Sequence, residues 1–170
     1  MKSTVINTLK YTGMVTLSQY IGTKKVKLVQ KHNKGGNALF NFLTDCLVGD
    51  FTKAKAASPN KIVLLGKGTD EEYIPKSGVI YLLSPAEKFY DEDEGWKVRY
   101  SFMVPKDQVE ATTFIDLSIG LYNSTFDDKT GNLLNYVALF ELDPKEVPST
   151  LTNTALVIDW ELSISNGADE

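Results

Sequence analysis

The segment Thr154–Asn166 constrains the fold of this chain more than any other. Between positions 158 and 165 its residues alternate strictly between apolar and polar. The apolar set consists of Ile158, Trp160, Leu162 and Ile164. Because successive side chains of a β-strand point to opposite faces, this period of two predicts a strand with one face in a core and the other in water.

Further segments predict strands that share this core. Residues 114–122 also alternate, and residues 133–142 are apolar on both faces, as a central strand would be. Shorter predicted strands occupy residues 61–65, 79–83 and 96–104. With about eight or nine strands, the chain predicts a mainly β fold, an antiparallel β-sandwich of the jelly-roll or immunoglobulin-like kind. We expect residues 1–170 to form a single domain.

The N-terminal part predicts an edge and a hairpin. Residues 1–12 are expected to form an edge strand or an extended arm, which Gly13 ends. Gly22-Thr23 separates two β-like runs and is typical of a two-residue hairpin turn. The second run carries lysines, which discourage edge-to-edge aggregation of an exposed strand. These are Lys24, Lys25, Lys27 and Lys31.

One amphipathic helix is predicted near residues 37–48. Asn37 is expected to cap its N-terminus, and Gly49 follows as the residue that ends it. Its apolar residues recur at helical spacing and form a stripe. They are Leu39, Phe42, Leu43, Cys46 and Leu47. We therefore expect Cys46 to be a buried, unreactive side chain.

Charge is distributed unevenly along the chain. Residues 1–67 contain eleven lysines and two aspartates, a net charge of +9. Residues 68–170 contain six lysines, one arginine and twenty acids, a net charge of −13. We expect the two parts to offset each other within one subunit or between neighbouring subunits. Nucleic acid is not favoured as a partner, because the basic part has few arginines and no clustered aromatic residues.

Two charged clusters form the candidate interaction surface. The first comprises the four lysines of residues 24–31. The second is an acidic run at an expected hairpin tip, and it comprises Asp91, Glu92, Asp93 and Glu94. Clusters of this kind on the loops and strands of a rigid sandwich are typical contact sites.

The sequence does not indicate catalytic or metal chemistry. His32 is the only histidine, and no serine lies in a G-x-S-x-G motif. With Cys46 as the only cysteine, a structural zinc site has too few ligands. Asp91–Glu94 and Asp127-Asp128 lack the alternating spacing of a calcium loop. We therefore expect neither enzymatic activity nor a metal or cofactor.

The composition suits a protein made in a cytoplasm. A single cysteine leaves no internal disulfide and suits a reducing compartment. The first residues contain no apolar core of a secretory signal. No apolar run reaches the roughly 20 residues needed to cross a bilayer, so no membrane contact is expected.

Five short motifs occur in a recognisable order. They are GMVTL at residues 13–17, KHNKGG at 31–36, KIVLLG at 61–66, IGLYN at 119–123 and LVIDWELSIS at 156–165. In this order they resemble the small virion structural proteins of tailed bacteriophages, particularly those of crAss-like phages. They are also similar to tail-collar and tail-fibre attachment modules. The resemblance covers most of the chain, implies a β-sandwich and brings no catalytic residues with it.

The resemblance implies a non-enzymatic structural or assembly protein of the virion, assembled in the host cytoplasm. It would contact other virion proteins and form a homo-oligomer. A tail or neck component (ring, collar or fibre-attachment subunit) is the first expectation, and a head-decoration or head-fibre protein on the capsid exterior is the alternative. The residues leave a second alternative open, a carbohydrate-binding sandwich. Its contact residues would be Tyr90, Trp96 and Tyr122, although the alternation of its strand places Trp96 in the core.

Overall fold

The computed structural model describes residues 8–67, 72–111, 117–127, 133–143 and 155–167. Within them the chain forms eleven strands and three helices. The strands are β1 Thr8–Ile21, β2 Lys24–His32, β3 Lys34–Gly35, β4 Pro59–Lys67, β5 Tyr73–Pro75, β6 Ile80–Tyr81, β7 Glu87–Asp91, β8 Gly95–Val104, β9 Leu117–Asn123, β10 Ala138–Glu141 and β11 Leu156–Gly167. The helices are α1 Asn37–Leu47, α2 Phe51–Ala57 and α3 Lys106–Ala111.

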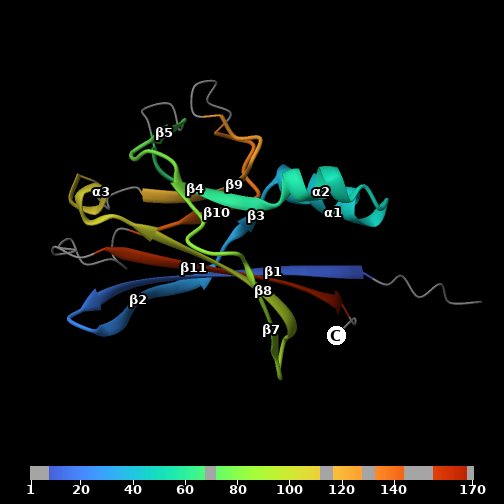
Figure 1. Ribbon diagram of the computed structural model, residues 1–170, viewed down its shortest axis with the longest axis horizontal. Coiled ribbons are helices and arrows are strands. Elements are labelled where there is room, and N and C mark those ends of the chain that lie inside the picture. Colours follow the sequence, from blue (N-terminus) through green and yellow to red (C-terminus); the bar gives the residue numbers. More distant parts are fainter. Residues whose placement is uncertain (1–7, 68–71, 112–116, 128–132, 144–154, 168–170) are drawn as a thin grey trace, which may run out of the picture.

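The strands form two antiparallel sheets that face each other (Figure 1). The five-stranded sheet has the order β2-β1-β11-β8-β7. The six-stranded sheet has the order β3-β10-β9-β4-β5, and β6 also pairs with β4. This arrangement confirms the predicted mainly β fold and the antiparallel sandwich.

The longest pairing joins β1 to β11, from Thr8 opposite Gly167 to Gln19 opposite Leu156. The predicted hairpin at Gly22-Thr23 is confirmed, since β1 and β2 pair up to Ile21 opposite Lys24. Gly22 has a φ of 62°, the left-handed conformation that such a turn requires.

Gly13 does not end a strand, contrary to the prediction. Strand β1 continues through it, and residues 1–7 of the predicted arm lie outside the described residues. Glycine is needed there because of a close neighbour. A Cβ atom at position 13 would lie 1.8 Å from Oδ1 of Asn33.

Asn33 lies at the turn where the chain leaves β2 and enters β3 in the other sheet, and its hydrogen bonds stabilise this turn. Its backbone N–H donates to the carbonyl of Gly13 at 3.1 Å. Its side-chain Nδ2 donates to the hydroxyl of Tyr11 at 3.1 Å, and its Oδ1 accepts from Nε1 of Trp160 at 3.1 Å. These three hydrogen bonds give partners to the backbone N–H and both side-chain polar atoms of Asn33, and they fix where the chain changes sheets.

The main core lies between the sheets and is built from the inward-facing residues of both. Trp160 at its centre has no exposed surface, as the alternation around it predicted. The largest fully buried members besides Trp160 are Leu17, Ile62, Leu64, Phe102, Leu117, Ile119, Leu121 and Phe140.

The six-stranded sheet is also covered on its outer face. A second apolar cluster forms there from buried residues, with Tyr73, Val79, Leu133 and Tyr136 packed against them. The buried members are Val63, Leu65, Tyr122, Phe126 and Leu139. Every residue of β9 is therefore buried, whereas its alternation predicted one exposed face. The earlier part of that predicted strand, residues 114–116, lies outside the described residues.

Two predicted strands are shorter in the structure. Of residues 133–142 only Ala138–Glu141 form a strand, because residues 133–136 instead turn over the outer face of the six-stranded sheet. Of residues 79–83 only Ile80–Tyr81 pair with β4.

Helix α1 is present where a helix was predicted, but its cap is not Asn37. The capping position is Gly36, whose N–H donates to the carbonyl of Val137 at 2.8 Å. A Cβ atom at position 36 would lie 2.0 Å from the carbonyl oxygen of Tyr136, so glycine is required there. Gly49, with a φ of 76°, follows the helix as predicted.

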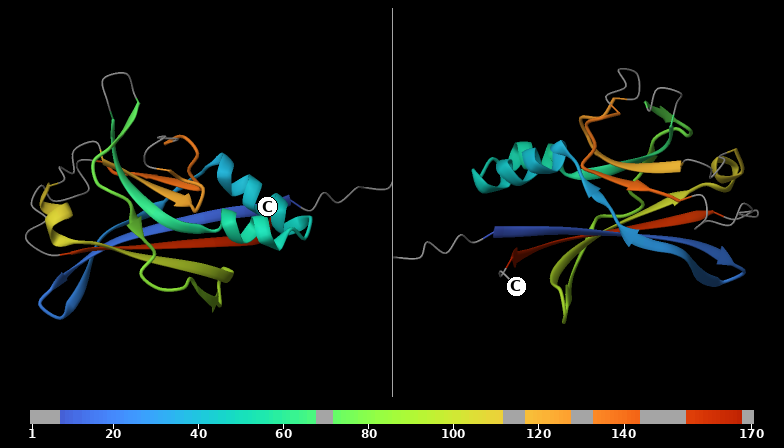
Figure 2. Two further views of the ribbon diagram at one scale, coloured as in Figure 1. Left: turned by 45° about the horizontal axis from the view of Figure 1, so that its top comes forward. Right: turned by 180° about the vertical axis from the view of Figure 1, so that it is seen from behind.

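Helices α1 and α2 pack together at one end of the sandwich, and α3 lies at the other (Figure 2). The sequence predicted only one helix. At the end of the sandwich that carries α1 and α2, strand β1 lies across from the helix pair (Figure 1).

Candidate interaction surfaces

The two predicted charged clusters lie far apart in the structure. The four lysines belong to β2, at one edge of the five-stranded sheet. The four acids occupy the tip of the β7–β8 hairpin, at the other edge. They therefore lie on strands at opposite edges of this sheet and not on neighbouring strands.

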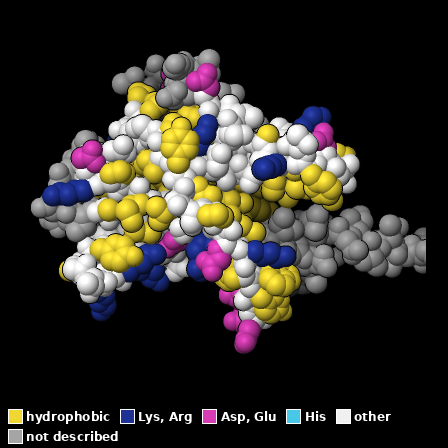
Figure 3. All heavy atoms as spheres, in the orientation of Figure 1, with side chains coloured by type: hydrophobic (Ala, Val, Ile, Leu, Met, Phe, Trp, Pro, Cys, Tyr) yellow, Lys and Arg dark blue, Asp and Glu magenta, His cyan; other side chains and the backbone are white. Residues whose placement is uncertain are grey.

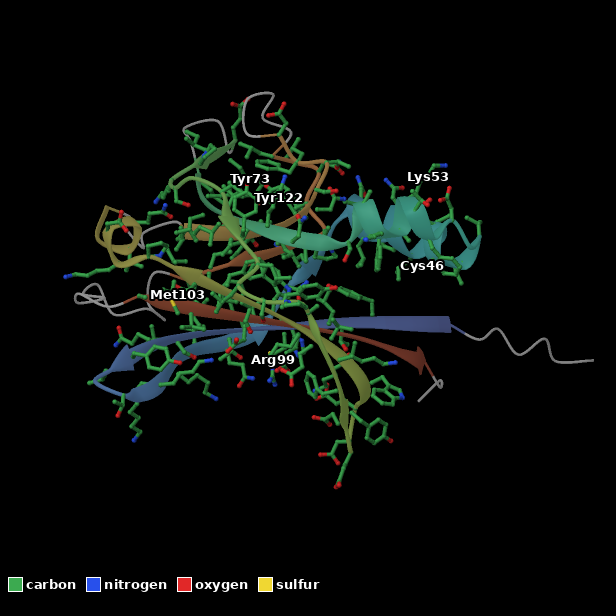
Figure 4. All side chains as sticks on the ribbon, in the orientation of Figure 1. Cys46, Lys53, Tyr73, Arg99, Met103 and Tyr122 are labelled. Atoms are coloured by element: carbon green, nitrogen blue, oxygen red, sulfur yellow. The ribbon has the colours of Figure 1, made fainter. Side chains whose placement is uncertain are left out.

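In the region between these two edges, ion pairs lie on the outer face of the five-stranded sheet. Lys25 Nζ lies 2.5 Å from Asp159 Oδ2, and the other oxygen of Asp159 accepts from Ser101 at 2.8 Å. In the next row Arg99 donates to Glu161 Oε1 through Nε and Nη2, at 2.9 and 2.7 Å. Figure 4 shows Arg99 on this outer side, away from the other sheet.

These contacts bring the basic and acidic parts of the chain together within one subunit. Lys25 from the first part bonds Asp159 from the second, and Lys34 likewise pairs with Glu141. The hydrogen bond and charge of Lys34 hold the pKa of Glu141 below its usual value. Glu141 in turn raises the pKa of Lys34.

Asp91, the first residue of the acidic tip, accepts the hydrogen bonds that hold the tip in its conformation. Oδ1 of Asp91 accepts from the backbone N–H groups of Asp93 and Glu94, both at 3.0 Å. Lys97 then lies 3.0 Å from Glu94 and 3.3 Å from Asp91. The N–H of Glu94, followed by Lys97, holds the pKa of Asp91 below its usual value. Lys97 thus compensates one of the four negative charges of the tip.

His32 has little room for chemistry around it. One ring nitrogen, Nδ1, lies 3.2 Å from the carbonyl of Gly13. The adjoining cavity, which Glu94, Lys97 and Ser163 also line, has a volume of about 20 Å³. A cavity of this size holds about one water molecule. Within the described ranges, no three His, Cys, Asp or Glu residues are grouped so that they could hold a metal ion.

The aromatic candidates divide between surface and interior. Tyr122 is fully buried, and its hydroxyl donates to the carbonyl of Leu133 at 2.7 Å. Trp96 is 58% exposed, contrary to the prediction that it lies in the core. It faces the same side as the core residues of β8, but the six-stranded sheet does not reach it. Tyr90 lies edge-on to Trp96 with ring centroids 5.3 Å apart, and Lys88 Nζ lies 4.4 Å from the Trp96 ring centroid.

Trp96 borders an apolar groove between α1 and the five-stranded sheet. The groove has a volume of about 250 Å³. One wall comes from α1, and the floor comes from β1, β8 and β11. Its lining residues are Tyr11, Leu39, Phe42, Leu43, Trp96, Val98, Tyr100 and Leu162. The two tyrosine hydroxyls of the groove already have partners, Asn33 for Tyr11 and Ser58 for Tyr100.

Next to the groove, large apolar side chains are exposed on α1, on the turn that follows it and at the start of α2. We call this set the apolar corner. It comprises Phe40 (64% exposed), Leu47 (78%), Val48 (71%) and Phe51 (75%). Apolar side chains gather beneath and at the end of the helix pair in Figure 3.

Cys46 lies on this corner and is exposed, contrary to the prediction that it is buried (Figure 4). The reason is the length of α1. Leu39 near its start is buried, but the last turn has no sheet beneath it. The predicted stripe is correct as a pattern, but only its first half is covered.

The apolar corner could have been predicted from the sequence, although the helical spacing of its residues indicated a buried stripe instead. Residues 47–51 (LVGDF) place three large apolar side chains around a helix-ending glycine. A chain turn is normally exposed, so such a cluster indicates an apolar surface.

No protein-family model matches the chain, and neither a curated protein nor a solved structure matches it significantly. Of the helices in the described part of the chain, none combines the length and the apolar character needed to span a bilayer.

Proposed function

We propose that this protein is a non-enzymatic structural or assembly protein of a tailed-phage virion that acts through protein–protein contacts. A tail or neck position, as a ring, collar or fibre-attachment subunit, is the preferred place. The alternative is a decoration or fibre protein on the outside of the capsid. Assembly would occur in the host cytoplasm, with other virion proteins as partners.

The observation that supports contact function is the concentration of uncovered apolar surface at one end of a rigid sandwich. The apolar corner and the groove lie side by side on α1. Monomeric proteins rarely expose contiguous apolar patches of this kind, and such patches mark interaction sites. The order of the five sequence motifs, from GMVTL to LVIDWELSIS, supports the assignment to a virion.

The charged outer face of the five-stranded sheet supports the same proposal in a secondary way. Its lysine edge and its acidic tip lie at opposite ends of one surface. Opposite charges at two edges favour an ordered side-by-side arrangement of subunits, and they contribute more to orientation than to affinity.

A carbohydrate-binding function is the second candidate, and the exposure of Trp96 beside Tyr90 favours it. Exposed aromatic rings are suitable platforms for sugars, but sugar recognition also needs free polar groups nearby. The groove beside Trp96 is lined by apolar residues, and its tyrosine hydroxyls are already hydrogen-bonded. Lys88 covers one part of the indole ring. These contacts favour a protein ligand over a sugar.

The direct test is the composition of phage particles purified on a density gradient from a culture that produces this chain. Peptide mass spectrometry should find the protein in the particle fraction at a fixed ratio to other structural proteins. Immunogold labelling should then place it on the tail or neck, or on the capsid for the alternative. Recovery only in the unassembled fraction would contradict the proposal.

A glycan array separates the second candidate from the first. The virion proposal predicts no glycan binding that depends on Trp96. Binding that Trp96→Ala abolishes and Leu134→Ala preserves would support the carbohydrate-binding module instead. Leu134 is a suitable control because it is 71% exposed and directly follows Leu133, which packs on the outer face of the six-stranded sheet.

A further inference from the structure

We propose that the outer face of the five-stranded sheet binds a saccharide that carries a carboxylate. The site is a shallow depression with a volume of about 350 Å³, which we call the polar hollow. Its lining residues are Thr16, Ser18, Lys25, Lys27, Arg99, Asp159 and Glu161. They belong to β1, β2, β8 and β11, so paired strands hold them in place. The inference goes beyond the proposed function and does not rest on it.

A β-bulge in β2 places Lys27 in the polar hollow. The register of β1 and β2 shifts so that Leu17 lies opposite Val29 and Ser18 opposite Lys27, which makes Leu28 the extra residue. Residues opposite each other on paired strands point to the same face of a sheet. Without the extra residue, Lys27 would point into the core with Val29, since alternate residues of a strand share a face.

The polar hollow contains one more cation than acid. Two of its three cations are in the ion pairs described above, Lys25 with Asp159 and Arg99 with Glu161. Lys27 is the third. Within the described part of the chain its ammonium group has no acidic partner, and it donates to a side-chain amide oxygen at 3.0 Å. A ligand with one carboxylate would therefore balance the charge of the hollow and give Lys27 an acidic partner.

The hydroxyl groups of the polar hollow are open to a ligand. Ser18 is only 2% exposed, yet neither its hydroxyl nor that of Thr16 bonds to another described residue. Buried polar groups are normally hydrogen-bonded, and a hydroxyl can both donate and accept. Glu161 takes both bonds from Arg99 on Oε1, which leaves Oε2 as a further acceptor. Donors and acceptors side by side on one surface are the complement of the neighbouring hydroxyls of a sugar.

An aromatic ring lies on the same face beside the polar hollow. Tyr20 follows Ser18 by two residues on β1, lies opposite Lys25 and is 39% exposed. A tyrosine ring offers an apolar surface on which the carbon face of a sugar can pack. The hollow and this ring together provide the polar and the apolar contacts that a saccharide needs, whereas the groove beside Trp96 is lined by apolar residues.

The first measurement is a glycan array that carries uronate- and sialate-bearing oligosaccharides beside neutral ones. We expect binding to carboxylate-bearing glycans. The strongest of them is then titrated in solution against its methyl ester, which keeps the hydroxyls and removes the charge. The ester should bind about tenfold more weakly, because a hydrogen bond to a charged group is lost. In ¹H–¹⁵N NMR spectra the shift changes should centre on the amides of Thr16, Ser18 and Lys27.

Two variants separate the two parts of the site. Lys27→Met should weaken binding of the acidic saccharide about tenfold and leave the methyl ester unaffected. Ser18→Ala should weaken both, and its urea midpoint checks that the fold is retained. Lys55→Met is the matched control, because Lys55 is exposed on α2 and its replacement removes the same charge. It should bind as the wild type does.

Several results would overturn the inference. Absence of binding to every carboxylate-bearing glycan excludes the site. Equal losses in Lys27→Met and Lys55→Met would mean general charge attraction only. Shift changes centred on Trp96 would place the sugar at the other candidate surface. A tri-glutamate peptide that binds as tightly as the saccharide would mean that carboxylates alone are recognised. None of these results decides whether the protein is part of a virion, which the particle composition tests separately.

Discussion

Each sheet gives one face to the shared core, but the chain treats their other faces differently. The outer face of the six-stranded sheet is covered by the chain's own segments, and Tyr122 and Leu139 are buried there. Of the residues that the structure describes, none forms such a cover on the outer face of the five-stranded sheet, which carries rows of ion pairs instead. The five-stranded sheet also extends its inner face past the other sheet, where the groove and Trp96 lie. One sheet is therefore an interior structure, and the other provides most of the surface available for contacts.

The largest effect should come from the core that both sheets share. Trp160→Ala removes a fully buried side chain, which typically costs about 3–5 kcal/mol of unfolding free energy. Urea denaturation followed by circular dichroism measures the change. Trp96→Ala is the matched control and should cost less than about 1 kcal/mol, because Trp96 is mostly exposed. Equal losses of unfolding free energy at the two positions would mean that Trp96 is as well packed as Trp160, and the five-stranded sheet would then have no uncovered end.

A smaller effect is expected on the covered outer face of the six-stranded sheet. Tyr122→Phe keeps the ring but removes the donor to the carbonyl of Leu133, which should cost about 1–3 kcal/mol. Thermal and urea unfolding both report it. Tyr90→Phe, at a 59% exposed ring, should be close to neutral. Burial also raises the pKa of Tyr122, so its phenol should remain protonated where exposed tyrosines ionise.

The ion pairs on the uncovered face should matter less for stability. A double-mutant cycle with Arg99→Met and Glu161→Gln should give a coupling of about 0.2–1 kcal/mol, which falls with added salt. A coupling well above this range would mean that this face is less solvated than its exposure indicates. The outer faces of the two sheets would then differ less in their exposure to water than the structure indicates.

The smallest expected effect concerns the acidic tip. Because the pKa of Asp91 lies below its ordinary value of 3.8, its carboxylate stabilises the folded hairpin at neutral pH. That contribution is lost as the pH falls through the folded-state pKa. A ¹³C NMR titration should place the Asp91 midpoint below 3.8. In Lys97→Met the midpoint should rise but stay below this value, since the N–H groups of Asp93 and Glu94 remain; a midpoint at or above 3.8 in the wild type would contradict the hydrogen bonding at the tip.

Local alternation predicted the strands that have one face in the shared core. Strand β11 is the clearest example, since Ile158 and Trp160 are buried and Asp159 and Glu161 face outward. Alternation failed for β9, because the segments that bury its outer side come from elsewhere in the chain. A period of two reports which residues share a face, but it does not report whether that face is later covered.

The same limit explains the errors at the candidate surfaces. Trp96 lies on the inward side of its strand as predicted, but the opposite sheet ends before it. Cys46 lies on the predicted helical stripe, but α1 extends beyond the sheet. In both cases the pattern was correct, and the length of the neighbouring element decided exposure. Neighbouring elements are set by tertiary packing, which a local pattern does not contain.

The pairing of β1 with β11 also determines when this chain can fold. Thr12 and Ser163 are 151 positions apart and lie side by side in the sheet. At synthesis rates of about 5–20 residues per second, β1 waits for roughly 8–30 s before the ribosome has made its partner. During that interval the β1–β2 hairpin has one edge defended by lysines and one edge without a partner. Nascent chains that stop before β11 should therefore aggregate, and productive folding should begin late in synthesis.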